Sequence, residues 1–106
     1  VDQFLKERIF EPHGMKDTGY NLTATQAKRA TGLHVQTPDK KVMYLEGRQT
    51  PTSGNTIFGG THGLFSTPTD YAKFAMMLLN KGTFNGKHLL RRKTWEFMTA
   101  NHVGDI

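Results

Sequence analysis

Residues 67–79 constrain the fold most, because they predict a helix that is apolar on nearly every side. Thr67 is a favoured N-cap residue, Pro68 suits the first helical position, and Asp70 places a carboxylate near the positive end of the helix dipole. The apolar stripe predicted for this helix consists of Tyr71, Phe74, Ala75 and Leu78. Met76, Met77 and Leu79 widen that stripe almost all the way round. Such a helix needs burial on all sides, so we expect further polypeptide to cover part of it.

The rest of the chain offers limited material for a core. It has 106 residues, of which 23 are Leu, Ile, Val or Phe, and a chain of this size buries roughly 60–65% of its unfolded surface. It contains no cysteine, which excludes a disulfide scaffold, a thiolate metal site and a cysteine nucleophile. No apolar run approaches the roughly 18 residues of a membrane helix. We expect an internal piece of a longer protein, because residues 1–10 already have the pattern of a helix in mid-sequence.

Two further helices and a hairpin are predicted before the glycine-rich region. Apolar residues at helical spacing predict a helix over residues 1–11, ended by Pro12. Thr23 and Gln26 have the spacing of a capping box, which predicts a short helix reaching Ala30. Residues 33–36 and 42–45 predict two strands joined by a turn at 37–40, which contains proline.

The remaining segments complete a fold class of α+β, mainly α. Residues 46–63 are rich in glycine and predict a long loop, which is uncommon in a compact domain unless it is functional or disordered. Residues 84–87 predict a turn, and residues 92–100 predict a last helix that buries Trp95 and Met98. The predicted architecture is three or four helices with one small β-hairpin and a long glycine-rich loop.

Residue patterns for catalysis, metals and cofactors are missing from the sequence. The chain has two serines, Ser53 and Ser66, and neither has lysine three residues later or lies in G-x-S-x-G. A capping or turn role fits Ser66 better than a nucleophilic one. The five histidines do not have the spacing of a zinc site. We expect no catalytic residue, metal or cofactor in this segment.

The loop at residues 59–63 (GGTHG) could present backbone N–H groups to an anion, although its signal for nucleotide binding is weak. Its glycines allow a tight passage beside another backbone, and it lacks the lysine of a phosphate loop. His62 is its one side chain that can titrate near neutral pH. The residues alone favour an ordinary exposed loop histidine at this position.

A second class of function is suggested by the charge pattern. The net charge is +5, and the stretch between Asp70 and Glu96 has no acidic residue. It has six basic residues: Lys73, Lys81, Lys87, Arg91, Arg92 and Lys93. An ordinary solvated basic face explains them, and a basic nucleic-acid-binding module is the alternative.

Four blocks of sequence resemble one known family. The blocks are similar to segments of the serine β-lactamase-related family. They are FLKERIFEP at residues 4–12, GMKDT at 14–18, GGTHGLFSTPTDYAKFAMMLL at 59–79, and the turn and helix of 82–98. That family includes class C β-lactamases, penicillin-binding DD-peptidases and related esterases. The order and spacing of the blocks also match. The resemblance implies a partial β-lactamase/transpeptidase-like fold.

The resemblance also implies where the chemistry lies. The family's S-x-x-K and Y-x-N motifs precede such a segment and its third motif, K-T-G or H-x-G, follows it, so residues 1–106 would form a single unit of the helical region. In class C β-lactamases the position of His62 resembles a bulky loop residue that borders the substrate pocket. Gly60, Thr61 and His62 are therefore the expected substrate-binding residues. His13 departs from the family, which usually has leucine there, and a polar ring costs packing unless it is exposed or paired.

Several expectations about the longer protein follow from the resemblance. The parent would hydrolyse an amide, lactam or ester through a serine acyl-enzyme, whereas the isolated segment would be inactive. Its partners would be the missing N- and C-terminal segments of the parent chain and a small-molecule or peptidoglycan-type substrate, with no nucleic acid and no membrane segment. We expect the parent to be periplasmic or secreted. A third, structural alternative is a folding unit that self-associates through exposed apolar surface.

Overall fold

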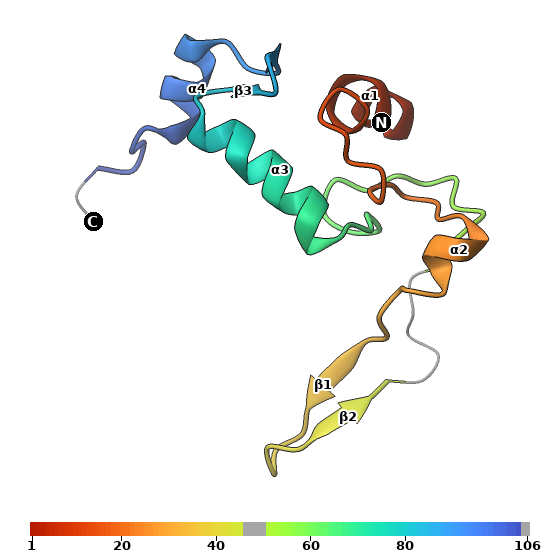
Figure 1. Ribbon diagram of the computed structural model, residues 1–106. Helices are drawn as coiled ribbons and strands as arrows, with labels where there is room; N and C mark the ends of the chain where they lie inside the picture. Colours follow the sequence, from red (N-terminus) through yellow and green to blue (C-terminus); the bar gives the residue numbers. More distant parts are fainter. Residues whose placement is uncertain (46–50, 105–106) are drawn as a thin grey trace. The chain divides into compact units, whose positions relative to one another are not determined.

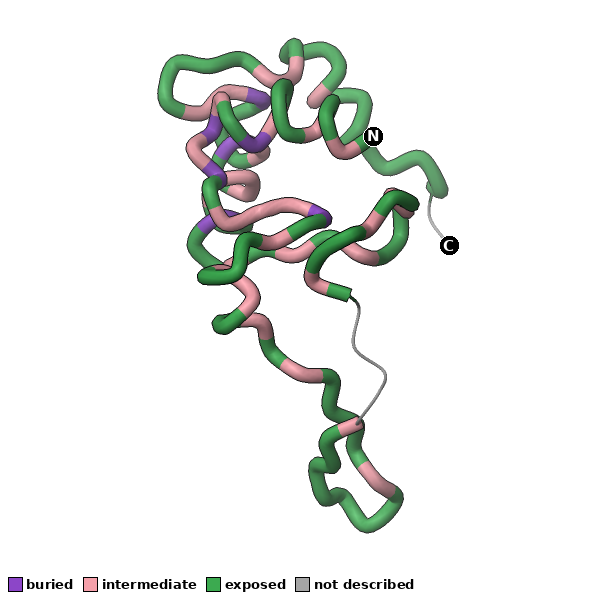
Figure 2. The backbone as a smooth tube through the Cα atoms, turned by 90° about the vertical axis from the view of Figure 1, so that its right-hand side faces the viewer, coloured by how far each residue is buried: buried purple, intermediate pink, exposed green. Residues whose placement is uncertain are grey.

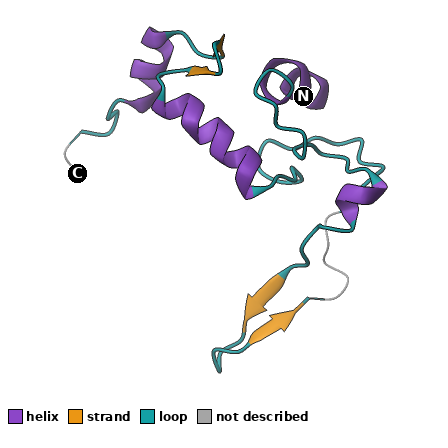
Figure 3. Ribbon diagram, viewed as in Figure 1, coloured by secondary structure: helices purple, strands orange, loops and turns teal. Residues whose placement is uncertain are grey.

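The computed structural model describes residues 1–45 and 51–104 and shows an α+β architecture, as predicted (Figure 1). The described residues form four α-helices and two small antiparallel sheets of two strands each (Figure 3). In chain order the elements are α1 (Asp2–Leu5), the π-helical turn η1 (Lys6–Phe10), α2 (Ala24–Ala27), β1 (His34–Gln36), β2 (Val42–Tyr44), α3 (Pro68–Leu79), β3 (Thr83–Phe84), β4 (Lys87–His88) and α4 (Arg92–Thr99).

The chain divides into two compact units. The first combines Val1–Thr18 with Ser66–Ile106, and the second is Gly19–Phe65. Buried positions are sparse among the described residues, and most lie in the first unit (Figure 2). The sequence also predicts that residues 1–106 form one part of the helical region of a larger domain, and this stays a prediction.

Helix α3 begins as the sequence predicts, and Phe74, Ala75 and Leu78 of the predicted stripe are half-buried. The Thr67 hydroxyl accepts a hydrogen bond from the Asp70 N–H at 3.2 Å, and Pro68 occupies the first turn. Met77 is fully buried, whereas Tyr71, predicted for the buried stripe, is 66% exposed. The prediction for Tyr71 is wrong because an apolar helix has several equivalent stripes, and packing alone selects one of them.

The first helix changes its hydrogen-bonding pattern after one turn. Predicted over 1–11, it is α-helical only in α1 and continues as η1, whose last residue, Phe10, is buried. Just beyond it, His13 is 3% exposed, and its Nδ1 donates to the Ile9 carbonyl at 2.7 Å. The His13 ring stacks on Phe84 with 6.0 Å between centroids, and its Nε2 is buried without a hydrogen-bond partner. The structure therefore pairs only one nitrogen of this unusual histidine.

The predicted short helix and hairpin are both present in the second unit. The capping box forms: Gln26 N–H donates to the Thr23 hydroxyl at 3.3 Å, and the Gln26 side chain accepts from the Thr23 N–H at 2.9 Å. The helix ends at Ala27, so its predicted extension to Ala30 is wrong. Strands β1 and β2 pair antiparallel with Val35 opposite Met43, each one residue shorter than predicted. Of the predicted 46–63 loop, residues 46–50 lie outside the described residues, and 51–63 are irregular.

The predicted turn at residues 84–87 is the tip of a second hairpin, β3–β4. Asn85 and Gly86 both have positive φ angles, 48° and 71°, which is the backbone of a type I′ turn. The following helix, α4, half-buries Trp95 but leaves Met98 52% exposed, so the predicted burial of Met98 is wrong. Which side chains of a short helix are buried depends on the residues that pack against it, and these are distant in sequence.

Gly82 and Gly86 offer a matched test of this region. Gly82 has a φ of +96°, and a Cβ there would lie 2.4 Å from the Leu90 carbonyl oxygen, whereas a Cβ at Gly86 would meet nothing within 4 Å. We expect Gly82→Ala to lower the free energy of unfolding by about 2–4 kcal/mol and Gly86→Ala by about 1 kcal/mol. Urea unfolding followed by circular dichroism measures both. Equal losses would contradict the close approach of Gly82 and Leu90.

Candidate functional site

The three predicted binding residues lie together on an exposed loop of the second unit. Gly60, Thr61 and His62 are all exposed. The Thr61 hydroxyl and His62 Nδ1 lie 3.1 Å apart, within hydrogen-bonding distance. A Cβ at Gly59 would lie 3.2 Å from the His62 ring. The absence of a side chain at residue 59 therefore leaves room for the imidazole in its present position.

Tyr20 supports this loop. Its side chain is 5% exposed, and its hydroxyl donates to the Gly59 carbonyl at 2.7 Å. The Phe58 ring makes an edge contact with the Tyr20 ring, with 5.2 Å between centroids. Gly63 has a φ of +92°, and a Cβ there would be 3.6 Å from the Tyr20 ring. The buried tyrosine thus anchors the backbone at Gly59 by a hydrogen bond, and its ring lies beside the space that a side chain at residue 63 would occupy.

Two further connections join residues 55 and 65, which flank this loop, to residues 19–21. Gly19 and Phe65 exchange both backbone hydrogen bonds, at 3.0 and 2.9 Å. The Asn21 side chain donates to the Asn55 carbonyl at 3.0 Å and accepts from the Asn55 N–H at 2.8 Å. The sequence indicated none of these supports, because the partners are 34 to 46 residues apart in a region without periodicity.

The arrangement suits contact with a ligand better than acid–base catalysis. His62 is exposed, and its side-chain hydrogen bond is to a hydroxyl rather than to a carboxylate. A catalytic histidine usually has a second group that orients it and stabilises its charged form. Within residues 1–45 and 51–104, no group of three His, Cys, Asp or Glu side chains could hold a metal ion.

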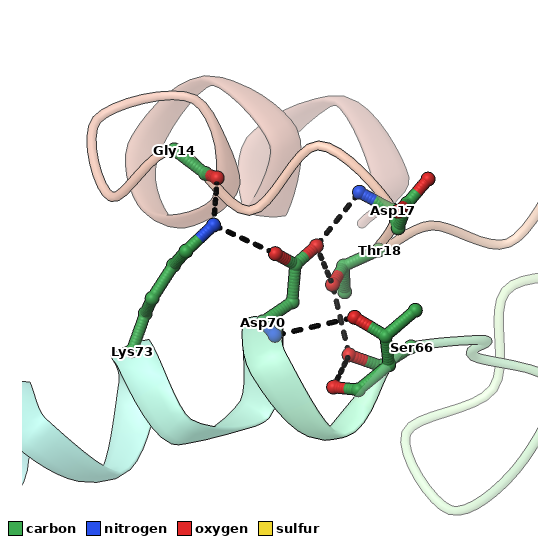
Figure 4. Close-up of polar contacts among 7 residues, drawn as sticks. Gly14, Asp17, Thr18, Ser66, Asp70 and Lys73 are labelled. Carbon is green, nitrogen blue, oxygen red and sulfur yellow. Dashed lines mark hydrogen bonds and ion pairs between the residues drawn. The ribbon is translucent and has the colours of Figure 1, made fainter.

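The first unit contains a buried polar cluster centred on Asp70, which is 4% exposed (Figure 4). Its Oδ2 accepts from the Asp17 N–H at 2.7 Å and from the Thr18 hydroxyl at 3.1 Å. Its Oδ1 pairs with Lys73 Nζ at 2.9 Å, and the same ammonium group donates to the Gly14 carbonyl. Asp70 therefore joins the N-terminus of α3 to residues 14–18.

These contacts hold Asp70 in its charged form. Burial by itself raises the pKa of this carboxyl group, but the hydrogen bonds from Lys73, Asp17 and Thr18 and the charge of Lys73 more than offset burial. The net result is a pKa below the ordinary value of 3.8.

The cluster does not contain an activated nucleophile. The Ser66 hydroxyl lies 2.9 Å from the Thr18 hydroxyl and donates to the Thr67 carbonyl at 3.4 Å. Lys73 points at Gly14 and Asp70 instead of Ser66 (Figure 4). Because a nucleophilic serine needs a base within hydrogen-bonding reach, this geometry supports the turn role predicted for Ser66.

Two basic residues of the stretch between Asp70 and Glu96 form ion pairs with the acidic residues that flank it. Lys73 pairs with Asp70, and Arg92 Nε lies 2.8 Å from Glu96 Oε1. These two basic residues are therefore not unpaired charges of the kind that contact phosphates. In the described portion of the chain, no helix has the length and apolar character needed to cross a membrane.

Comparison with known proteins identifies the family. The family model described as Beta-lactamase matches residues 1–106. Two curated proteins of Mycobacterium tuberculosis are each 27% identical over 103 residues, which cover 97% of this chain and 26% of the relative. They are described as "Uncharacterized protein MT1414" (strain CDC 1551 / Oshkosh) and "Protein Rv1367c" (strain ATCC 25618 / H37Rv).

The chain belongs to the Beta-lactamase family, because the family match runs over its whole length. The predicted relation to serine β-lactamases is confirmed, and the α+β elements are consistent with part of a β-lactamase-like fold. The chain spans about a quarter of the length of the curated relatives that it matches. Membership relates it to serine hydrolases at the level of the family.

Asp70→Asn tests the buried cluster. We expect a loss of about 1–3 kcal/mol of unfolding free energy at pH 7, because the amide keeps the shape but loses the charge-assisted hydrogen bonds. The folded pKa lies below the ordinary 3.8, so the wild-type advantage is present above pH 3.8 and is lost as pH falls through the folded pKa. Urea unfolding at a series of pH values measures the difference between the two proteins.

The exposed acid Asp2 provides the control. Asp2→Asn should change stability little at any pH, because the side chain of this acid is 46% exposed. A constant difference between Asp70→Asn and wild type down to pH 2 would show that the Asp70 charge does not contribute to stability.

Proposed function

We propose that this chain is an internal segment of a longer serine hydrolase of the Beta-lactamase family. The observation that carries the proposal is the family match over residues 1–106, combined with relatives of which the matched residues make up only 26%. The parent hydrolyses an amide, a lactam or an ester. Its substrate is a small molecule or a peptidoglycan-type peptide, and its location is periplasmic or secreted.

The proposed chemistry is acyl transfer through a serine. The serine oxygen attacks the substrate carbonyl carbon, and the C–N or C–O bond breaks while the amine or alcohol takes up the serine proton; in a lactam the amine stays attached through the opened ring. Water then hydrolyses the ester bond to the enzyme. The reaction needs a base beside the serine and donors for the oxyanion. The contacts of Ser66 support the proposal that the nucleophile lies elsewhere in the parent, and that residues 1–106 alone are inactive.

The loop of Gly60, Thr61 and His62 contributes one wall of the substrate cleft in this proposal. Its support is the combination of exposed polar side chains and a backbone held by Tyr20. A fixed backbone lowers the entropy lost when a side chain contacts a ligand. The imidazole can donate to or accept from a substrate amide or carboxylate.

A covalent labelling experiment tests the acyl-enzyme. The full-length protein and the 106-residue chain are incubated with a chromogenic cephalosporin and with a short-chain p-nitrophenyl ester. We expect a burst of product and an acyl adduct in the mass spectrum of the full-length protein only. Full-length Ser66→Ala should form the same adduct. A burst from the 106-residue chain that is lost in Ser53→Ala or Ser66→Ala, or no adduct on the full-length protein, would contradict the proposal.

His62→Gly tests the substrate contact. In the full-length protein we expect the KM of the preferred substrate to rise about fivefold, which corresponds to the loss of one hydrogen bond of about 1 kcal/mol. The yield of acyl adduct at saturating substrate should be unchanged. His34→Gly, which removes another exposed histidine of the same unit, is the control. A KM equal to wild type would place His62 outside the substrate site.

A further inference from the structure

The tip of the β3–β4 hairpin consists of Asn85 and Gly86, the one Asn-Gly pair in the sequence, and both residues are exposed. An asparagine loses its side-chain amide when the backbone nitrogen of the next residue attacks its side-chain carbonyl carbon. Glycine permits this attack best, because it has no Cβ to hinder the approach of its nitrogen. A Cβ at Gly86 would meet nothing within 4 Å, so the fold does not shield this position either.

The surroundings of Asn85 differ from those of the other four asparagines. The side chains of Asn21, Asn55 and Asn101 are each held by hydrogen bonds to backbone groups. Asn80 ends α3 and precedes a lysine, whose side chain hinders the attacking nitrogen. Within residues 1–45 and 51–104, no group forms a hydrogen bond with the Asn85 side chain. Its amide can therefore rotate toward the backbone of the next residue.

The closed turn opposes the reaction, which must wait for the hairpin to open. In a type I′ turn the first central residue has a ψ of about +30°, and this places the next nitrogen nearly opposite the Cα–Cβ bond. Opening requires little disruption, because β3 and β4 have two residues each and so short a hairpin is marginally stable by itself. The positive φ of Asn85, 48°, is also less favourable for asparagine than for glycine.

We propose that Asn85 is a site of spontaneous deamidation, which occurs when the tip of the β3–β4 hairpin opens. The Gly86 nitrogen forms a bond to Asn85 Cγ, the C–N bond of the side-chain amide breaks, and ammonia leaves with the proton of the Gly86 N–H. Water then adds to one of the two carbonyl carbons of the five-membered imide, and the bond from that carbon to nitrogen breaks. The products are aspartate and isoaspartate, in which the backbone continues through the side-chain carbon. The reaction is independent of the proposed hydrolase activity.

The isoaspartate product is incompatible with the packing of the hairpin. Phe84, the residue before Asn85, stacks on the buried His13 ring, and the Gly82 carbonyl accepts from the N–H groups of Leu89 and Leu90 at 2.9 and 3.2 Å. One additional backbone carbon at residue 85 moves the two strands out of register. Because ammonia is lost, the change is irreversible, and the modification weakens the first unit slowly and permanently.

Peptide mass mapping of the full-length protein after weeks at neutral pH tests the site. We expect the mass gain of amide-to-acid conversion at Asn85, at a rate at least about tenfold above that of the four other asparagines. Unfolding in urea should accelerate it, because the turn is then open. Gly86→Ala should slow it about tenfold although it weakens the turn, since the added Cβ hinders the attacking nitrogen.

Asn85→Asp is the control for stability, because it adds the same charge without the additional backbone carbon. The purified isoaspartyl form should unfold at a midpoint at least about 3 °C below that of Asn85→Asp. Equal midpoints would contradict the effect on packing.

Two results would overturn the site itself. Modification of Asn85 in urea but not in the folded protein would show that the hairpin stays closed. A wild-type rate in Gly86→Ala would show that the residue 86 nitrogen is not the attacking group.

Discussion

The buried Asp70 carboxylate is the interaction on which the rest of the first unit depends. It connects the first turn of α3 with the backbone of residue 17 and the side chain of Thr18, which are more than 50 positions earlier in the chain. A buried carboxylate without donors would be strongly destabilising, so this contact specifies one position of the helix instead of merely favouring it. Lys73 adds a second connection to Gly14 through the same cluster.

The choice of the buried face on α3 links this cluster to the surface of the unit. Asp70 and Met77 face inward, and as a consequence Tyr71, Met76 and Leu79 face outward. In the second unit, a buried tyrosine has the corresponding role. Tyr20 binds the glycine-rich loop, and Thr61 and His62 of that loop are exposed. In both units a single side chain with a polar end fixes a segment that hydrophobic contacts alone would leave undetermined.

The fold was predictable where local chemistry decides it. The N-cap at Thr67, the capping box at Thr23 and the first hairpin all formed as predicted, since each depends on residues within a few positions of one another. The predictions for Tyr71 and Met98 are wrong because burial depends on partners that are distant in sequence. The sequence predicted only the turn of the second hairpin, because strands of two residues are too short to show alternation of apolar and polar side chains.

The sequence by itself determined the family, the α+β class, the start of α3 and the loop that carries Gly60, Thr61 and His62. These follow from spacing and from motifs, which local interactions enforce. Only the tertiary structure decided which side of α3 is buried, that His13 is inside with one nitrogen unpaired, and that Tyr20 supports the loop. The physical reason is that the hydrophobic effect is not directional, so it does not by itself select which apolar face of a helix is buried. The polar contacts that give it direction join residues whose proximity exists only after the chain has folded.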